Sequence, residues 1–368
     1  MATPSQCEDA RLATLVRQFH EHPVTSGAAW PEAAPGPEEP KRARTDKGRP
    51  KKAPPEIVTV EALSKMELQQ PKYVFESLIT GPGAWTMIGS QKAGKTLLAA
   101  QMALSYQRPV PLLDYYRTLE SRGVLFVEQD DPAGLAAVKR ILEKSPIPAD
   151  PQKFFTVAGA NFTIGPDLVA FLEPEIRGRD IGIVVLDSYT AMRPTRTGGC
   201  DIVKAERTDF STLDQLAKRT DCVVLILHHK SKGSAGLDWS DQGAGTYAIS
   251  MATEGEIHLS RFRDLPINAP ERLIQVRGRN CEGAELVVRF DAATLTYSFV
   301  LEGGAAQLYP HVIEIKRAFS GRAFGPKDLA QELGLARVSA HRLIGRLMAA
   351  GAVLRRGYGE YVLAGGLQ

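Results

Sequence analysis

The sequence predicts an α/β fold with a mostly parallel sheet. Short, continuous apolar runs occupy residues 85–88, 124–127, 183–186 and 223–227, and helical patterns lie between them. Continuous rather than alternating apolar runs are typical of parallel strands that are buried on both faces. Further runs at 256–263, 272–277, 286–290 and 295–300 are joined by short turns. We therefore expect an antiparallel extension of the same sheet.

Composition excludes several classes of protein. The 368 residues are 43% hydrophobic and 24% charged, as in soluble globular proteins. No apolar stretch approaches the roughly 20 residues that span a bilayer, and the N-terminus lacks the apolar core of a secretory signal. The four cysteines are scattered without zinc-site spacing. We expect a cytoplasmic protein without membrane partners, whose net charge of +3 is too small to argue for nucleic-acid binding.

The chain divides into three predicted parts. Residues 1–55 are expected to form a disordered tail, because the stretch 31–55 is rich in Pro, Gly and charge. Seven lysines and arginines between residues 41 and 52 make this tail either a non-specific nucleic-acid arm or a solvated linker. Residues 56–303 carry the predicted α/β core. Residues 304–368 are expected to form a small separate domain.

The first motif lies between the run at 85–88 and a helical pattern at 97–105. It has the Walker A spacing G-x-x-x-x-G-K-[ST] and predicts a loop that wraps its backbone N–H groups around a phosphate, at the positive end of a helix. Lys95 is expected to reach the β- and γ-phosphates, and Thr96 to bind Mg²⁺. The predicted ATP-binding residues are Gly89, Ser90, Gln91, Lys92, Ala93, Gly94, Lys95, Thr96 and Leu97.

Acidic residues follow two of the predicted strands. Asp187 ends the run at 183–186, which is the pattern of a Walker B strand that delivers a carboxylate to Mg²⁺. Glu128 and Asp130 follow the run at 124–127, and on an extended strand they share a face. One of these two is expected to activate the water that attacks the γ-phosphate. The alternative is an acidic strand end that has no role beyond its electrostatic effect on Mg²⁺.

The run at 223–227 ends in His228 and His229. A polar group here can contact the γ-phosphate, and we expect a sensor, with His228 preferred. The loop that follows, 230–245, contains Lys230, Lys232 and Trp239. Lysines with an aromatic residue suit single-stranded nucleic acid, although a plain surface loop is the alternative.

Two basic groups lie later in the chain. Arg277 and Arg279 alternate at the end of the run at 272–277, so they could reach a neighbouring subunit's γ-phosphate. The C-terminal region predicts helices at 312–319, 328–333 and 338–350 and a hairpin at 351–363, the elements of a winged helix-turn-helix domain. Its exposed polar residues suit duplex DNA, although such domains also bind proteins. These residues are Arg337, Ser339, Arg342, Arg346, Arg355 and Arg356.

Together these motifs resemble the RecA-like P-loop ATPases, and in particular the RepA-like hexameric replicative helicases of plasmids and phages. The resemblance covers about residues 70–300 and is most specific at the His-His pair followed by Ser-Lys-Gly at 231–233. It implies ATP and Mg²⁺ as ligands, and a finger role in trans for Arg277 and Arg279. The family's catalytic glutamate falls at Asp130, so either Asp130 or Glu128 serves, or hydrolysis is weak.

We therefore expect an ATPase that acts as a DNA motor, a ring-forming helicase with DNA, a homo-oligomer (a hexamer) and possible replication proteins as its partners. In this reading the catalytic residues are Lys95, Asp130, Glu128, His228, Arg277 and Arg279. The rival reading is an ATP-switched DNA-binding initiator or regulator that does not unwind DNA. A recombinase-like filament is a third.

Overall fold

The computed structural model describes residues 57–66, 72–130, 135–157, 159, 161–196, 201–229, 247–319 and 321–365. The predicted tail at 1–55 and the loop residues Lys230, Lys232 and Trp239 lie outside these ranges. The chain divides into two units, Met1–Glu67 and Leu68–Gln368. In the first unit, the described helix α2 (Val60–Lys65) is capped by the Thr59 hydroxyl and buries none of its residues.

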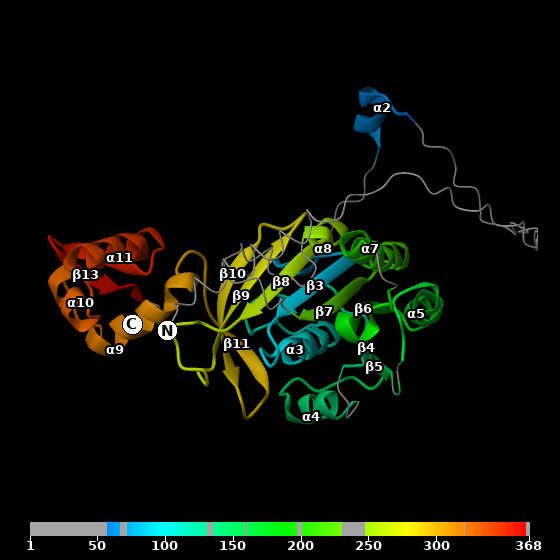
Figure 1. Cartoon of the computed structure of the whole chain (residues 1–368), viewed down its shortest axis with the longest axis horizontal. Helices are drawn as coiled ribbons and strands as arrows, with labels where there is room; N and C mark the ends of the chain where they lie inside the picture. The colour runs from blue at the N-terminus through cyan, green and yellow to red at the C-terminus, as the bar shows by residue number, and fades with distance from the viewer. Residues whose placement is uncertain are drawn as a thin grey trace, which may run out of the picture. The chain divides into compact units, whose positions relative to one another are not determined.

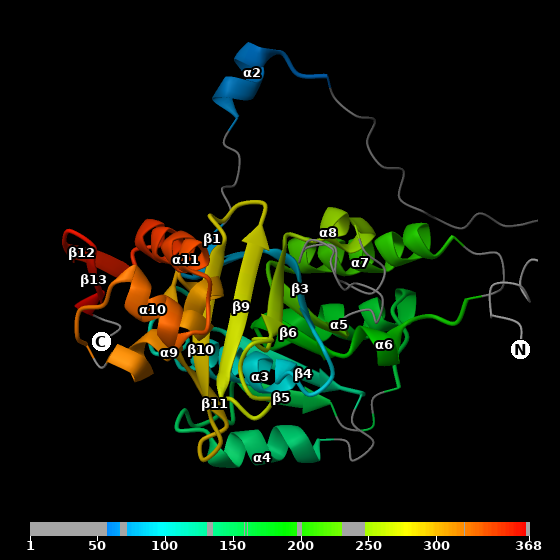
Figure 2. The same ribbon diagram turned by 60° about the vertical axis from the view of Figure 1, so that its left-hand side comes forward.

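The second unit is built on a sheet with the strand order β11-β10-β9-β8-β3-β7-β6-β4-β5 (Figures 1 and 2). The parallel half contains β3 (Gly83–Gly89), β4 (Gly123–Glu128), β5 (Phe154–Val157), β6 (Ile181–Asp187) and β7 (Val223–His229). Strand β3 lies between β7 and β8 and is parallel to both. Its carboxyl end is therefore surrounded by strand ends on either side.

The other half of the sheet confirms the predicted antiparallel extension. Strand β8 (Gly255–Ser260) is followed by β9 (Glu271–Gly278), β10 (Ala284–Asp291) and β11 (Thr296–Glu302), which pair antiparallel in that order. The strand expected at 256–263 ends earlier, at Ser260. The sequence did not reveal β5, or the hairpin of β1 (Lys72–Phe75) and β2 (Ile79–Gly81), because these strands are short.

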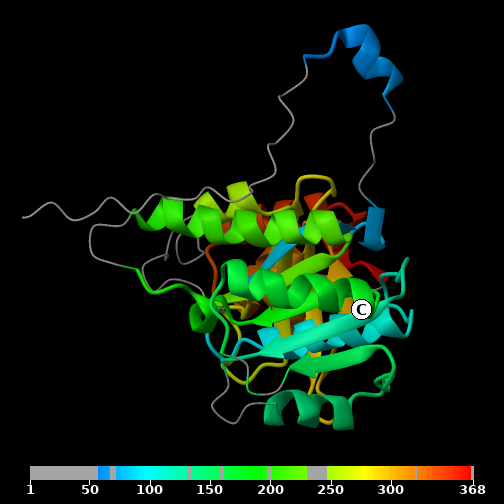
Figure 3. The ribbon, with the colours of Figure 1, turned by 90° about the vertical axis from the view of Figure 1, so that its right-hand side faces the viewer.

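Helices cover both faces of the parallel half (Figure 3). On one face α3 (Lys95–Gln107) and α4 (Ala136–Lys144) pack on alternate strand residues such as Ile183 and Val185. On the other face α5 (Pro166–Gly178) and α7 (Ile202–Thr220) pack on Val184 and Leu186. The short helix α6 (Tyr189–Met192) follows β6, and the short helix α8 (Tyr247–Ala252) precedes β8. This double coverage explains the continuous apolar runs in the sequence.

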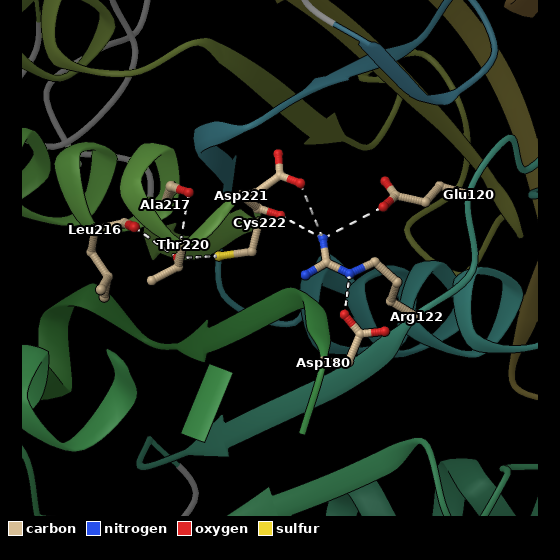
Figure 4. A network of polar contacts seen from close by, with 8 residues as sticks. All are labelled: Glu120, Arg122, Asp180, Leu216, Ala217, Thr220, Asp221 and Cys222. Carbon is tan, nitrogen blue, oxygen red and sulfur yellow. Dashed lines mark hydrogen bonds and ion pairs between the residues drawn. The ribbon is translucent and has the colours of Figure 1, made fainter. Parts of the chain in front are cut away.

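At the amino ends of the parallel strands, Arg122 joins two helix-to-strand turns (Figure 4). Its Nε donates to Asp180 Oδ1 over 2.8 Å, and its Nη1 donates to the backbone oxygen of Asp221. Asp180 and Asp221 occupy equivalent places, before β6 and β7, and both have left-handed backbones, with φ of 49° and 52°. Arg122 also contacts Glu120 and the Asp221 carboxylate at 3.5 and 3.8 Å. The end of the sheet opposite the Walker A loop is thereby tied together.

The C-terminal residues form a short 3-10 helix η2 (Ala306–Leu308), α9 (Tyr309–Phe319), α10 (Pro326–Glu332), α11 (Arg337–Ala349), β12 (Val353–Gly357) and β13 (Glu360–Leu363). These elements match the predicted order, although α11 begins at Arg337 rather than after it. Phe324 forms an isolated antiparallel β-bridge with Tyr361 of β13. Val287 of β10 and Leu301 of β11 share a hydrophobic cluster with Val312 of α9. Within the described ranges, no helix has both the length and the apolar character needed to cross a membrane.

Candidate functional site

The Walker A loop connects β3 to α3 at the carboxyl end of the sheet. Gly89 has no room for a side chain, because a Cβ there would lie 2.7 Å from the Leu259 backbone oxygen. Gly94, the N-cap residue before α3, has φ of 104°, and a Cβ there would lie 1.9 Å from the Tyr297 hydroxyl. The loop can therefore close tightly only with glycine at both positions.

The Lys95 ammonium lies over this loop. Its Nζ donates to the backbone oxygens of Gly89 and Ser90 over 3.1 and 3.2 Å. Lys95 is only 7% exposed, and burial lowers its pKa, while the nearby carboxylates of Asp187 and Asp130 act in the opposite direction. Those two negative charges favour the charged lysine that an anionic ligand requires.

The side chains of Thr96 and Asp187 form a direct hydrogen bond. The Thr96 Oγ1 donates to Asp187 Oδ2 over 2.6 Å, which brings two oxygen ligands together at the start of α3. Burial raises the pKa of Asp187, the Asp130 charge adds to this, and the Thr96 hydrogen bond opposes it. The described residues contain no group of three or more His, Cys, Asp or Glu that could hold a metal alone. Mg²⁺ keeps several waters and takes phosphate oxygens, so the Thr96–Asp187 pair fits it.

Glu128 and Asp130 have different surroundings. Glu128 is 6% exposed, and its Oε1 accepts a hydrogen bond from the Asp130 backbone N–H over 2.8 Å. The Asp130 side chain is 40% exposed. Its Oδ1 accepts from Ser188 Oγ over 3.1 Å, and its Oδ2 lies 3.4 Å from His229 Nε2. Glu128 therefore shapes the turn, while Asp130 is the more accessible carboxylate.

The two histidines at the end of β7 point in opposite directions, as successive strand residues do. His229 Nδ1 lies 3.2 Å from Lys95 Nζ. An ammonium can only donate, so Nδ1 is the acceptor of this contact, and the opposite ring nitrogen, Nε2, faces Asp130. His228 is 3% exposed and packs edge-on against Tyr189, with ring centroids 5.0 Å apart. The sequence-based preference was for His228, whereas the structure brings His229 to Lys95.

A pocket of about 300 Å³ opens beside these groups. Thr96, Leu97, Glu128, Asp130 and Asp187 line one part of it. The rest is lined by residues that the sequence did not single out, namely Ala137, Arg140, Ile141 and Leu295. Ala137, Arg140 and Ile141 are three and four residues apart, so they share one face of α4, and this spacing could have been read from the sequence. Leu295 lies in the turn between β10 and β11, and no motif in the sequence around it indicates that it lines the pocket. A larger pocket of about 340 Å³, between β11 and α9, lies away from this loop.

The other predicted site residues lie elsewhere. Arg277 and Arg279 are exposed at the end of β9 that pairs with the start of β8, away from the chain's own Walker A loop. The Arg279 guanidinium donates to the Met251 backbone oxygen. The polar residues predicted on and around α11 are exposed, whereas its Leu343, Ile344 and Leu347 are buried. Arg355 lies over the Tyr358 ring at 5.9 Å.

A glycine-lined loop between a central parallel strand and a helix, with a lysine over the loop and a threonine–aspartate pair beside it, is the arrangement of a P-loop ATPase. The chain belongs to the AAA domain family, whose model matches residues 49–235. Family membership implies the use of a nucleotide.

Among solved structures, the ATPase domain of G40P is similar to this chain at 10% sequence identity and a TM-score of 0.45, over 60% of this chain and 85% of that one. No curated protein sequence matches the chain.

Proposed function

We propose that the chain is an ATP-dependent DNA motor, a ring-forming helicase of the replicative type. The observation that carries this proposal is the contact of His229 with both Lys95 and Asp130 at the end of β7. Lys95 would hold the γ-phosphate and Asp130 would face the attacking water, so His229 touches both sides of the reaction. The loop at 230–245 follows His229 directly in the sequence.

Lys95, Thr96 and Asp187 hold Mg·ATP in this proposal. Thr96 and Asp187 would hold Mg²⁺, which would supply positive charge to offset the negative charge of the phosphates. Asp130 accepts the proton of the attacking water, because its carboxylate is accessible and is oriented by Ser188. Glu128 supports it through the Asp130 backbone N–H.

His229 replaces His228 as the sensor. A γ-phosphate that draws Lys95 toward itself weakens the Lys95–His229 contact, and the ring then shifts at the start of the following loop. Lys230, Lys232 and Trp239 of that loop bind single-stranded DNA. Arg277 and Arg279 act on the nucleotide of the neighbouring subunit, which suits their distance from the chain's own loop.

The test is ATP hydrolysis with and without single-stranded DNA. We expect DNA to stimulate hydrolysis, and Lys95→Ala to abolish it. Lys139→Ala removes an exposed lysine of α4 and serves as the matched control. Equal hydrolysis with and without DNA would contradict the motor.

The second candidate is a nucleotide-switched DNA-binding protein that does not unwind DNA. It is supported by the exposed arginines of α11, since Arg337, Arg342 and Arg346 form no ion pair with any described residue. ATP would then set the oligomeric state, and the C-terminal residues would bind duplex DNA. ATP-dependent strand separation on a forked substrate excludes this candidate, and specific duplex binding without separation supports it.

A further inference from the structure

Tyr297 on β11 contacts the back of the Walker A loop, 204 residues away in sequence. Its hydroxyl donates to the Ala93 backbone oxygen over 3.3 Å, and its ring is 2% exposed. The same hydroxyl fills the space where a Cβ of Gly94 would lie. The ring also packs on Phe290 of β10, with centroids 5.4 Å apart. The last strand of the sheet therefore supports the loop from behind.

Gln101 holds Tyr297 in this place. The Gln101 Nε2 donates to the Tyr297 backbone oxygen, and its Oε1 accepts from the Tyr297 N–H, both over 2.8 Å. Gln101 is 4% exposed and belongs to α3, the helix that begins with Lys95 and Thr96. An edge strand such as β11 has backbone groups without a neighbouring strand, and Gln101 supplies their partners.

The peptide between Ala93 and Gly94 links this contact to the ligand. In a planar trans peptide the carbonyl oxygen and the following N–H point in opposite directions. A carbonyl of Ala93 that is held on Tyr297 therefore directs the Gly94 N–H away from β11. A P-loop binds phosphate through such inward N–H groups.

The β10–β11 hairpin also touches two other regions. Leu295, in its turn, lines the pocket beside Thr96. Leu301, near the end of β11, packs in one cluster with Leu308 and Val312 at the start of the C-terminal helices. A single strand thus contacts the nucleotide pocket, the Walker A loop and the C-terminal helices.

We propose that Tyr297 is a positioning residue of the nucleotide site, and that β11 couples nucleotide binding to the C-terminal helices. Tyr297 orients the Ala93–Gly94 peptide for phosphate binding, and nucleotide in turn stabilises β11 and α9. This inference rests on the proposed binding of ATP.

The first test compares Tyr297→Phe with wild type in titrations of the full chain with a fluorescent ADP analogue. Losing one hydrogen bond to the loop should raise the dissociation constant about 3- to 10-fold. The matched control is Tyr106→Phe, which removes another buried hydroxyl of the same core cluster, one that lies beside Gly182 at the C-terminal end of α3. The control should bind as wild type does. A folded Tyr297→Phe protein with unchanged affinity overturns the proposal.

The second test measures amide hydrogen exchange with and without ADP. We expect nucleotide to slow exchange in residues 296–302 and 309–319 of wild type, and this effect to disappear in Tyr297→Phe. Unchanged exchange in these residues of a wild-type protein that binds ADP overturns the coupling. If Tyr297→Phe does not fold, Gln101→Met removes both bonds to β11 and should weaken ADP binding similarly; unchanged affinity then counts against the proposal. Failure of wild type itself to bind ADP refutes the proposed function, and Lys95→Ala marks that baseline.

Discussion

His229 accepts a hydrogen bond from Lys95 over 3.2 Å, and this contact joins the end of β7 to the Walker A loop. The opposite ring nitrogen faces Asp130. His229 thus contacts both Lys95 and Asp130, whereas His228 lies on the other face of β7, against Tyr189.

Replacing His229 should affect turnover more than binding. For His229→Ala we expect kcat for ATP to fall about 10- to 100-fold and its dependence on DNA to disappear, because the link between Lys95 and the following loop is lost. Steady-state hydrolysis with and without single-stranded DNA measures this. The control is His311→Ala, which removes a partly exposed histidine of α9. Retained DNA stimulation in His229→Ala would show that the sensor lies elsewhere.

Amide substitutions can distinguish the catalytic roles of Asp130 and Glu128. Asp130→Asn should lower kcat about 10²- to 10⁴-fold with ADP affinity little changed, because it removes the proton acceptor. Glu128→Gln keeps an oxygen that accepts from the Asp130 N–H and should cost less. Single-turnover hydrolysis decides between the two, and a larger loss in Glu128→Gln would reverse the assignment.

Asp187→Asn should stabilise the nucleotide-free protein while weakening Mg·ATP binding. Burial raises the pKa of Asp187, so the charged carboxylate lowers the free energy of unfolding. That cost is complete above the folded pKa and disappears as the pH falls below the unfolded value near 4. Melting curves at neutral and acidic pH should show an increase in Tm only at neutral pH. An equal increase at both would contradict the charge explanation.

Arg122→Ala should destabilise the fold by about 2 kcal/mol, because it removes charged hydrogen bonds at two turns. Urea denaturation of wild type and variant measures this change in the free energy of unfolding. Lys139→Ala is the control, since Lys139 is exposed and pairs with Glu143 within one helix. Its effect should stay below about 0.5 kcal/mol. Equal losses in the two variants would mean that the turns do not depend on Arg122.

The exposed arginines of α11 predict a salt-dependent interaction. If Arg342 and Arg346 contact phosphates, each change to alanine should reduce the slope of log K against log salt for duplex DNA by about 1. Fluorescence anisotropy over a salt series measures this slope. Glu332→Ala, at the exposed end of α10, controls for surface substitution. An unchanged slope in both arginine variants would favour a protein partner.

Local spacing was sufficient to predict the Walker A loop and Asp187, because each belongs to one strand and the turn after it. The choice between His228 and His229 could not be made this way. Apolar residues face both sides of β7, so the run does not show which side carries the nucleotide. Leu295 and Tyr297 could not be found either, because their contacts with the loop depend on how the antiparallel strands fold back over α3.

The position of Tyr297 also sets the length of an autonomous ATPase fragment. The family model ends at residue 235, before β8 begins at Gly255. A truncation at that boundary would keep the Walker A and Walker B motifs. It would nevertheless expose one edge of β3 and remove both Leu295 and the support behind Ala93. A fragment that retains Leu295 and the whole of β11, including Tyr297, extends to Glu302.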